Sequence, residues 1–154
     1  MKKIIKLNNL NKLIKSIKDK KKVLVGGCFD ILHIGHIYFL EKAKEKGDKL
    51  LVLLESDEKI KRLKGLNRPV NDQLSRAIVL SGLQSIDFII LLPFLDSERE
   101  YDELVVKIKP QIIVSTKGNS DIKYLKRSAQ KVGGKLVLVP SVSNHSSSSI
   151  LSKI

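Results

Sequence analysis

The sequence is poor in several residue types, and each shortage removes a class of protein. Its 154 residues include one cysteine, Cys28, so an internal disulfide framework or a cysteine-based zinc cluster is excluded. A reducing compartment is the simplest expectation. Tryptophan is absent, and four Phe and three Tyr do not provide the aromatic platforms typical of single-strand nucleic-acid binders. No apolar run approaches the roughly 18 residues that a membrane-spanning helix needs.

Acidic residues are also scarce, and the formal net charge is +13. Such a charge permits nucleic-acid binding, contact with anionic membranes, or anionic substrates. Only five of the 29 basic residues are arginine, and the lysines are scattered along the chain. A solvated, lysine-rich surface explains most of this charge, so we expect no nucleic-acid partner. Polar residues interrupt the segment from Ile4 to Leu13, which is therefore not a signal-peptide core, and we expect a cytoplasmic protein.

The length fits one domain, and hydrophobic patterning predicts its class. Short strands that are apolar throughout alternate with amphipathic helices, which favours a parallel sheet covered on both faces. We predict a single Rossmann-like, doubly wound α/β domain over residues 21–154, with a five-stranded parallel sheet. A helical extension is expected over residues 1–20, because Leu10, Leu13, Ile14 and Ile17 have helical spacing. The predicted strands are 22–27, 50–54, 88–92, 112–114 and 136–139, and the later helices are 34–46, 71–83, 97–108, 120–132 and 147–154.

Four polar segments follow predicted strands directly, at 26–36, 55–68, 115–121 and 141–149. In doubly wound sheets, ligands bind outside the carboxyl ends of the strands, where these segments meet. We read residues 55–70 as a polar loop without regular structure. The sequence therefore predicts a binding site at one edge of the sheet.

The segment from Gly26 to His36 has features that suit a phosphate group. Glycines let the backbone approach a ligand closely, and His33 and His36 project from one face if a helix begins near them. Free N–H groups and the helix dipole at that end favour an anion. By themselves, two histidines at this spacing are more often surface residues or a metal site than a phosphate site. Zinc would need at least one further ligand, with only His145 and carboxylates to supply it, and we predict no metal site.

Other segments carry candidate phosphate contacts with ordinary alternatives. Lys64, Arg68 and Arg76 can neutralise phosphates, although the first two also fit a solvated charged loop. Ser146 to Ser148 offer hydroxyls and N–H groups at a helix start, or else form a flexible Ser-rich tail. Cys28 reads best as a packing residue, since no partner base is in view.

The pattern Gly-x-Phe-Asp-x-x-His-x-Gly-His at residues 27–36 resembles the signature of the cytidylyltransferase-like nucleotidyltransferase superfamily. That superfamily includes glycerol-phosphate cytidylyltransferases, pantetheine-phosphate adenylyltransferases, archaeal FAD synthetases and heptose-phosphate adenylyltransferases. From about Leu24 to Ile154 the chain most resembles the adenylyltransferase domain of ADP-heptose synthase. The matching segments are Gly27 to His33, Ser56-Asp57, Leu63 to Gly65, Arg68 to Asn71, Lys117-Gly118, and Ser146 to Ile150.

The chain departs from that family at two places. Gly26 stands where the family has Asn, and Asn119-Ser120 replace its Gly-Asp. Asn119 and Ser120 belong to the loop before the predicted helix at 120–132. The resemblance implies that this loop contacts the base and ribose of the nucleotide. The base and the acceptor are consequently not specified by the sequence.

The resemblance implies transfer of AMP from ATP to a phosphorylated acceptor, such as D-glycero-D-manno-heptose 1-phosphate, with release of pyrophosphate. Mg²⁺ is the implied cofactor, commonly held by substrate phosphates and water. A homodimer is also implied. The implied catalytic residues are His33, His36, Lys64 and Arg76; the implied nucleotide-binding residues are Gly27, Cys28, Phe29, Asp30, Gly35, Lys117, Gly118, Ser146, Ser147 and Ser148; the implied substrate-binding residues are Ser56, Asp57 and Arg68.

Three alternatives stay open. The same phosphate site would serve a glycerol-3-phosphate cytidylyltransferase, which uses CTP. It would also serve an FAD synthetase-type enzyme, which joins ATP and FMN. Outside the class, the chain could be a non-catalytic nucleotide-binding or nucleic-acid-binding protein.

Overall fold

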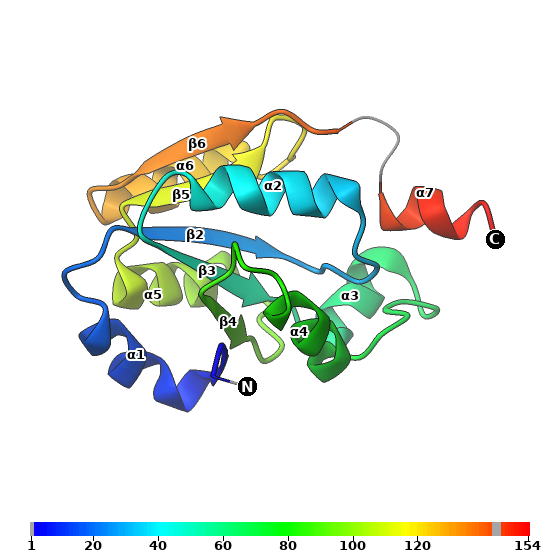
Figure 1. Cartoon of the computed structure of the whole chain (residues 1–154), viewed down its shortest axis with the longest axis horizontal. Coiled ribbons are helices and arrows are strands. Elements are labelled where there is room, and N and C mark those ends of the chain that lie inside the picture. Colours follow the sequence, from blue (N-terminus) through cyan, green and yellow to red (C-terminus); the bar gives the residue numbers. More distant parts are fainter. Residues whose placement is uncertain (1, 143–145) are drawn as a thin grey trace.

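A computed structural model describes residues 2–142 and 146–154, and its centre is a parallel sheet (Figure 1). The strand order is β1-β4-β3-β2-β5-β6, and every neighbouring pair is parallel. The parallel α/β class is confirmed, but the prediction of five strands is wrong because the sheet has six. The strands are β1 (Ile4–Lys6), β2 (Lys22–Gly27), β3 (Lys49–Leu54), β4 (Phe88–Leu91), β5 (Ile112–Thr116) and β6 (Lys135–Val139).

The additional strand lies in the segment that we expected to be a helical extension. β1 pairs with β4 at the edge of the sheet, with Ile4 opposite Ile89 and Ile5 opposite Ile90. It is followed by a 3₁₀ turn, η1 (Leu7–Asn9), and then by α1 (Leu10–Ser16). The predicted amphipathic helix is present, and Leu10 and Leu13 are buried on it. The division of the chain at residue 20 stays a prediction.

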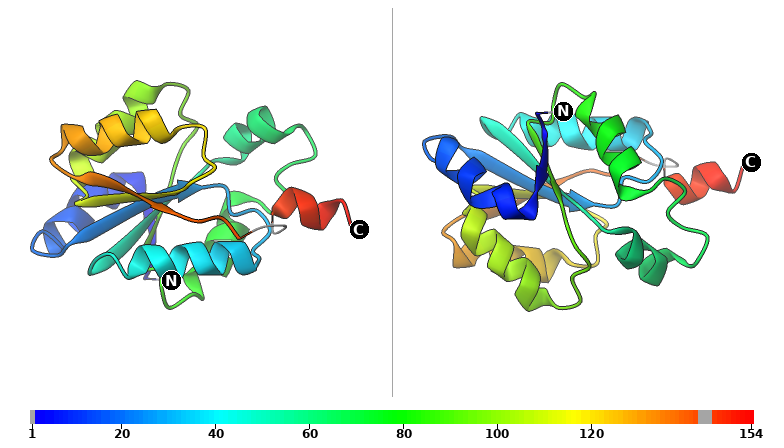
Figure 2. Two further views of the ribbon diagram at one scale, coloured as in Figure 1. Left: turned by 90° about the horizontal axis from the view of Figure 1, so that it is seen from above. Right: turned by 90° about the horizontal axis from the view of Figure 1, so that it is seen from below.

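Helices cover both faces of the sheet, because side chains alternate between the faces along each strand. On one face, α2 (Ile34–Lys44) and α4 (Gln73–Ser81) pack against a cluster that includes Val23 and Val25. On the other face, α1, α5 (Glu98–Ile108) and α6 (Ile122–Lys131) share a cluster with Leu24 and Leu51. Figure 2 shows these two helical layers with the sheet between them.

The segment read as a polar loop contains a helix, α3 (Asp57–Lys64). The Ser56 side chain accepts a hydrogen bond from the Lys59 N–H at 3.1 Å and so caps its start. Acidic residues occupy the first turn and basic residues the last, which suits the helix dipole. The one buried position on this short helix is Ile60, so the sequence shows no apolar stripe to reveal it.

The strand order reverses between β2 and β5, because β3 and β4 extend the sheet on one side and β6 on the other. α3 and the last helix, α7 (Ser147–Leu151), lie beyond the carboxyl ends of the strands (Figures 1 and 2). The fold therefore places its switch point at the end of β2, where ligands bind in this architecture. Within the described residues, none of the helices is long and apolar enough to cross a bilayer.

Candidate active site

A cavity of about 670 Å³ opens at the switch point. It lies at the carboxyl ends of β2, β3 and β5, between α2 on one side and α5 and α6 on the other. Most of its polar lining comes from the four segments that the sequence places after strands. From these segments come Cys28, His33, His36, Glu55, Lys59, Lys64, Ser115, Thr116, Asn119, Asp121, Ser141 and Ser146, and from α5 and α6 and the residue before α5 come Ser97, Tyr101 and Tyr124.

The turn after β2 is tightly packed. A Cβ atom on Gly27 would lie 2.8 Å from Cε2 of Phe29. Any residue other than glycine at this position would therefore force the Phe29 ring to move. Phe29 itself has a positive φ of 46° and is buried. Its ring centroid lies 5.1 Å from that of His36. Because Gly27 has no side chain, the Phe29 ring has room to fold back beside the histidines.

The two histidines lie together at the start of α2. His33 is the N-cap residue, and its Nδ1 accepts a hydrogen bond from the Gly35 N–H at 3.1 Å. The imidazole rings of His33 and His36 are stacked, with centroids 3.8 Å apart and planes 27° apart. The structure thus brings this predicted pair to the cavity wall, beside the N–H groups of a helix start that favour an anion.

His36 has a neutral imidazole at ordinary pH. Burial, followed by the nearby His33 and Lys64 charges, lowers the pKa of His36 from 6.5 to about 4, against the opposing effect of a hydrogen bond with the Ile31 backbone. Its Nδ1 is one of two buried side-chain nitrogen or oxygen atoms without a hydrogen-bond partner among the described residues, the other being an Nη of Arg68. Buried polar atoms without a partner are uncommon in folded proteins, which makes His36 Nδ1 a candidate contact for a polar group.

Asp30 has structural partners. Its carboxylate accepts hydrogen bonds from Arg68 Nε at 2.8 Å, from the Val70 N–H at 2.8 Å and from the Asn71 N–H at 3.0 Å. Burial alone raises the pKa of this carboxyl, but the hydrogen bonds from Asn71, Val70 and Arg68 outweigh it, so the pKa is lowered. Asp30 thus anchors the 68–71 segment under the histidine turn.

Arg76 also serves the framework. Its guanidinium donates to the backbone carbonyls of Cys28 at 2.7 Å and Glu55 at 2.9 Å, and to the Asp57 carboxylate at 2.7 Å. Its side chain is fully buried. These bonds join α4 to the ends of β2 and β3 and leave Arg76 outside the described cavity lining. The structure therefore shows no direct route from Arg76 to a phosphate.

The implied substrate-binding residues have comparable partners. Ser56 caps α3, Asp57 pairs with Arg76, and Arg68 pairs with Asp30. None of the three is among the described residues that line the cavity. Lys64, in contrast, lines it from the exposed end of α3. Lys59 lines it too, with its ammonium bonded to the Leu95 carbonyl at 3.0 Å.

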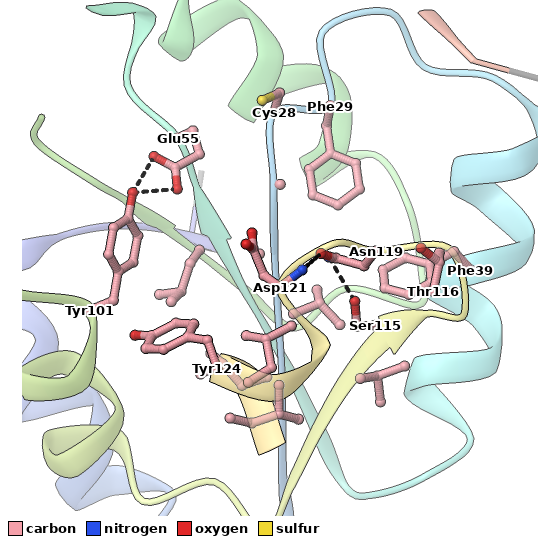
Figure 3. A pocket seen from close by; sticks show the side chains of 18 of the residues that line it. Cys28, Phe29, Phe39, Glu55, Tyr101, Ser115, Thr116, Asn119, Asp121 and Tyr124 are labelled. Atoms are coloured by element: carbon pink, nitrogen blue, oxygen red, sulfur yellow. Dashed lines mark hydrogen bonds between the residues drawn. The ribbon is translucent and has the colours of Figure 1, made fainter. Parts of the chain in front are cut away.

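The end of β5 and the loop after it line the cavity, but through residues adjacent to the expected nucleotide contacts Lys117 and Gly118. Ser115, Thr116, Asn119 and Asp121 line it, whereas Lys117 and Gly118 are exposed and lie outside the described lining. Asn119 donates to the Ser115 hydroxyl at 2.9 Å and accepts from the Asp121 N–H at 2.7 Å (Figure 3). These bonds hold the loop in a compact turn against β5.

The serine segment lies at the cavity only in part. Ser146 lines the cavity, and the Ser148 hydroxyl accepts a hydrogen bond from Arg68 at 3.4 Å. Ser147 begins α7, but its side chain falls outside the described residues, as does His145 entirely. Cys28 lines the cavity as well, and burial raises the pKa of its thiol, which fits a packing residue better than a nucleophile.

Glu55, Tyr101 and Tyr124 are among the lining residues that were not predicted from the sequence. The Tyr101 hydroxyl donates to both Glu55 carboxylate oxygens, at 2.8 and 3.0 Å, and Tyr124 lies beside them (Figure 3). Burial raises the pKa of Glu55, although Tyr101 and Lys59 counteract it. Burial and the Glu55 contact raise the pKa of Tyr101. Glu55 was recognisable in principle, because it directly follows a buried strand at the ligand edge; the tyrosines come from helix interiors and give no such signal.

The family model for cytidylyltransferase-like proteins matches residues 24–151. The chain belongs to the cytidylyltransferase-like family. The resemblance carried by the Gly-x-Phe-Asp-x-x-His-x-Gly-His pattern is thus confirmed. The match includes every element that forms the cavity.

Curated relatives include the bifunctional protein HldE of Helicobacter hepaticus, which is 39% identical over 152 residues, or 99% of this chain. The same protein of Campylobacter curvus is 48% identical over 96 residues, or 62% of this chain. These relatives bear out the predicted similarity to the ADP-heptose synthase branch. The chain spans only 30% and 20% of their respective lengths.

Solved structures share the fold. The lipopolysaccharide core biosynthesis protein of Thermoplasma volcanium has a TM-score of 0.66 and 31% identity, over 80% of this chain and 99% of that one. The pantoate-β-alanine ligase of Francisella tularensis has a TM-score of 0.68 over 98% of this chain and 72% of its own. At 16% identity, the second likeness concerns the fold alone.

Proposed function

We propose that this chain is a nucleotidyltransferase that moves AMP from ATP to a sugar 1-phosphate, such as D-glycero-D-manno-heptose 1-phosphate, and releases pyrophosphate. The observation that carries the proposal is the stacked His33 and His36 pair at the start of α2, facing a cavity at the switch point of a cytidylyltransferase-like chain. The HldE relatives support the choice of a heptose phosphate and of ATP.

The reaction needs positioning and charge stabilisation rather than a protein nucleophile. An oxygen of the acceptor phosphate attacks the α-phosphorus of the nucleotide, a new P–O bond forms, and the bond to pyrophosphate breaks. Negative charge builds on the phosphate oxygens in the transition state. His33, His36 and the N–H groups of α2 donate hydrogen bonds to these oxygens, and Lys64 adds a positive charge from the end of α3.

The low pKa of His36 defines its part in this step. With a pKa of about 4, its imidazole is neutral at pH 7 and carries a single N–H. In this proposal that N–H donates to the phosphate in place of the Ile31 backbone. Arg76, Asp30 and Arg68 act indirectly in this proposal, by fixing the histidine turn and the end of β3 through their buried hydrogen bonds. They are positioning residues.

The nucleoside lies on the β5 and β6 side in this proposal. Thr116, Asn119 and Ser141 line that part of the cavity and offer hydroxyl and amide groups to base and ribose. Ser146, Ser147 and Ser148 bind the β- and γ-phosphates. Lys117 and Gly118 remain proposed nucleotide contacts that would require the exposed loop to move inward.

The magnesium ion enters with the nucleotide in this proposal. The described residues contain no group of three or more His, Cys, Asp or Glu that could hold a metal ion. This fits an ion bound chiefly by phosphate oxygens and water, as Mg²⁺ commonly is. When bound, it would neutralise charge on the triphosphate, while the histidines orient the α-phosphate.

A pyrophosphate-release assay over nucleotides and acceptors tests the proposed substrates. Wild-type protein is incubated with ATP or CTP, each paired with heptose 1-phosphate, glycerol 3-phosphate or FMN, with Mg²⁺ present. We expect pyrophosphate from ATP with heptose 1-phosphate only. Turnover with CTP and glycerol 3-phosphate alone, or with ATP and FMN alone, contradicts the proposal. RNA binding with a steep salt dependence and no pyrophosphate from any pair would favour a non-catalytic binder.

A further inference from the structure

The cavity has a second region that the phosphate chemistry does not use. We call it the acceptor lobe and define it by Glu55, Lys59, Tyr101, Val105, Tyr124 and Leu125, all of which line the cavity. In Figure 3, Glu55, Tyr101 and Tyr124 lie on one side of β2, and Phe39, Thr116 and Asn119 lie on the other. The lobe therefore has aromatic and apolar walls with a carboxylate set among them.

The two sides of the histidine turn assign this lobe to the acceptor. Thr116 ends β5 and Glu55 follows β3, so the sheet order puts them on opposite sides of the β2 end that carries the histidines. In the proposed function the nucleoside lies on the side of Thr116 and Asn119. The attacking oxygen approaches the phosphorus from outside the nucleotide, which leaves the side of Glu55 for the acceptor.

The groups in the lobe suit a ring that carries several hydroxyls. A carboxylate offers about four lone-pair sites, and the single Tyr101 hydrogen, shared at 2.8 and 3.0 Å, leaves most of them for other donors. Neighbouring hydroxyls of a sugar can donate to both carboxylate oxygens at once. The tyrosine rings offer an apolar surface against which the C–H face of the sugar can pack. Small-molecule sites commonly combine such aromatic walls with a few polar groups.

The charge in the lobe also orients the acceptor. The Glu55 carboxylate repels a phosphate and attracts hydroxyls, whereas Lys64 and the start of α2 attract the phosphate. The Tyr124 hydroxyl is held by the Glu98 carbonyl at 3.1 Å and by Asp102 at 3.2 Å, so its ring is fixed in place. An acceptor with a phosphate at one end and hydroxyls at the other fits this arrangement with its phosphate toward Lys64 and its hydroxyls toward Glu55, since the Lys59 ammonium is bonded to the Leu95 carbonyl.

We propose that Glu55 is a specificity-determining residue that binds vicinal hydroxyls of the acceptor sugar, and that Tyr101 is a positioning residue that aims its carboxylate. This inference rests on the proposed function for the identity of the reaction. It goes beyond it by naming the groups that select a polyhydroxylated acceptor over a simple phosphate.

The test compares steady-state constants of four single variants with ATP and heptose 1-phosphate. Glu55→Gln keeps the shape but removes the charge, and Tyr101→Phe removes only the hydroxyl. Glu103→Gln and Tyr38→Phe are matched controls outside the cavity lining, on α5 and α2. We expect Glu55→Gln to raise the acceptor KM by about tenfold or more, since hydrogen bonds to charged groups are worth that much. Tyr101→Phe should raise it less, and the ATP KM should be unchanged in both.

Two results distinguish failure of this inference from failure of the proposed function. If wild-type protein uses heptose 1-phosphate but Glu55→Gln and Tyr101→Phe leave its KM at the control value, the lobe assignment is wrong and the function stands. If wild-type protein gives no turnover with heptose 1-phosphate, calorimetric titration with that compound decides. Binding that weakens in Glu55→Gln but not in Glu103→Gln supports the lobe, and absence of binding overturns both.

Discussion

At the scale of single residues, His36 links protonation to stability. Its pKa is about 4 in the folded chain, against 6.5 for a free histidine. The unfolded chain therefore takes up a proton first as the pH falls, and the folded state loses stability between about pH 6.5 and about pH 4. We expect the free energy of unfolding, measured by urea denaturation, to fall through this window and to fall less in His36→Asn.

The variant is compared with wild type at each pH, so carboxylates that titrate in the same range cancel in the difference. A difference between the two proteins that does not change between pH 7 and about pH 4.5 would show that His36 is not held neutral by burial. The neutral, hydrogen-bonding role of His36 in the reaction would then lose its basis.

The histidine turn and the arginines show which site residues a sequence can reveal. Gly27, His33 and His36 lie within ten residues, so their pattern alone predicts a phosphate site at a helix start. Arg76 carries equal charge, but its partners Cys28 and Glu55 lie 48 and 21 positions away. Only the folded chain shows that those carbonyls occupy its guanidinium, which turns an expected phosphate contact into a framework bond.

At the scale of elements, Arg76 joins α4 to the carboxyl ends of β2 and β3. Its replacement by Met leaves three backbone carbonyls, those of Cys28, Glu55 and Asn71, and the Asp57 carboxylate without their donor. We expect Arg76→Met to lower the free energy of unfolding by about 3–5 kcal/mol, because an acceptor that loses its donor away from water costs about 1–3 kcal/mol and several are affected. Arg99→Met is the control, because its ion pair with Glu103 is exposed and worth at most about 1 kcal/mol.

Urea denaturation of both variants provides the measurement, with pyrophosphate release as the second readout. An Arg76→Met protein with wild-type stability and no turnover would contradict the framework role and restore Arg76 as a direct phosphate ligand. A large loss of stability, matched by no loss in Arg99→Met, agrees with the buried hydrogen bonds of the structure.

Elements with a long apolar pattern are predictable, and short or polar ones are not. The buried strands β2 to β6 follow from runs such as Leu50 to Leu54, because both sheet faces are covered. β1 has only three residues, the last of them Lys6, and is stabilised by pairing with β4 at the edge. α3 has one buried residue and depends on its cap and charges. Neither produces a periodicity that the sequence alone could show.

At the scale of the whole molecule, the site depends on strand order. The edge at which polar segments meet follows from the alternation of strands and helices, and the switch point between β2 and β5 confirms it. The pairing of Glu55 with Tyr101 crosses from the end of β3 to α5, 46 positions along the chain, and cannot be predicted without the fold. The homodimer implied by the family resemblance stays a prediction.

The central claim is that the His33 and His36 pair forms the centre of nucleotidyl transfer. The most direct test is pyrophosphate release from ATP and heptose 1-phosphate by wild type, His36→Ala and the control Tyr38→Phe on the same helix, with thermal unfolding of each. We predict that His36→Ala loses about 10²–10³-fold in turnover, as for removal of one transition-state donor, while its melting temperature stays within a few degrees of wild type. A folded His36→Ala protein that turns over at the wild-type rate would contradict the account.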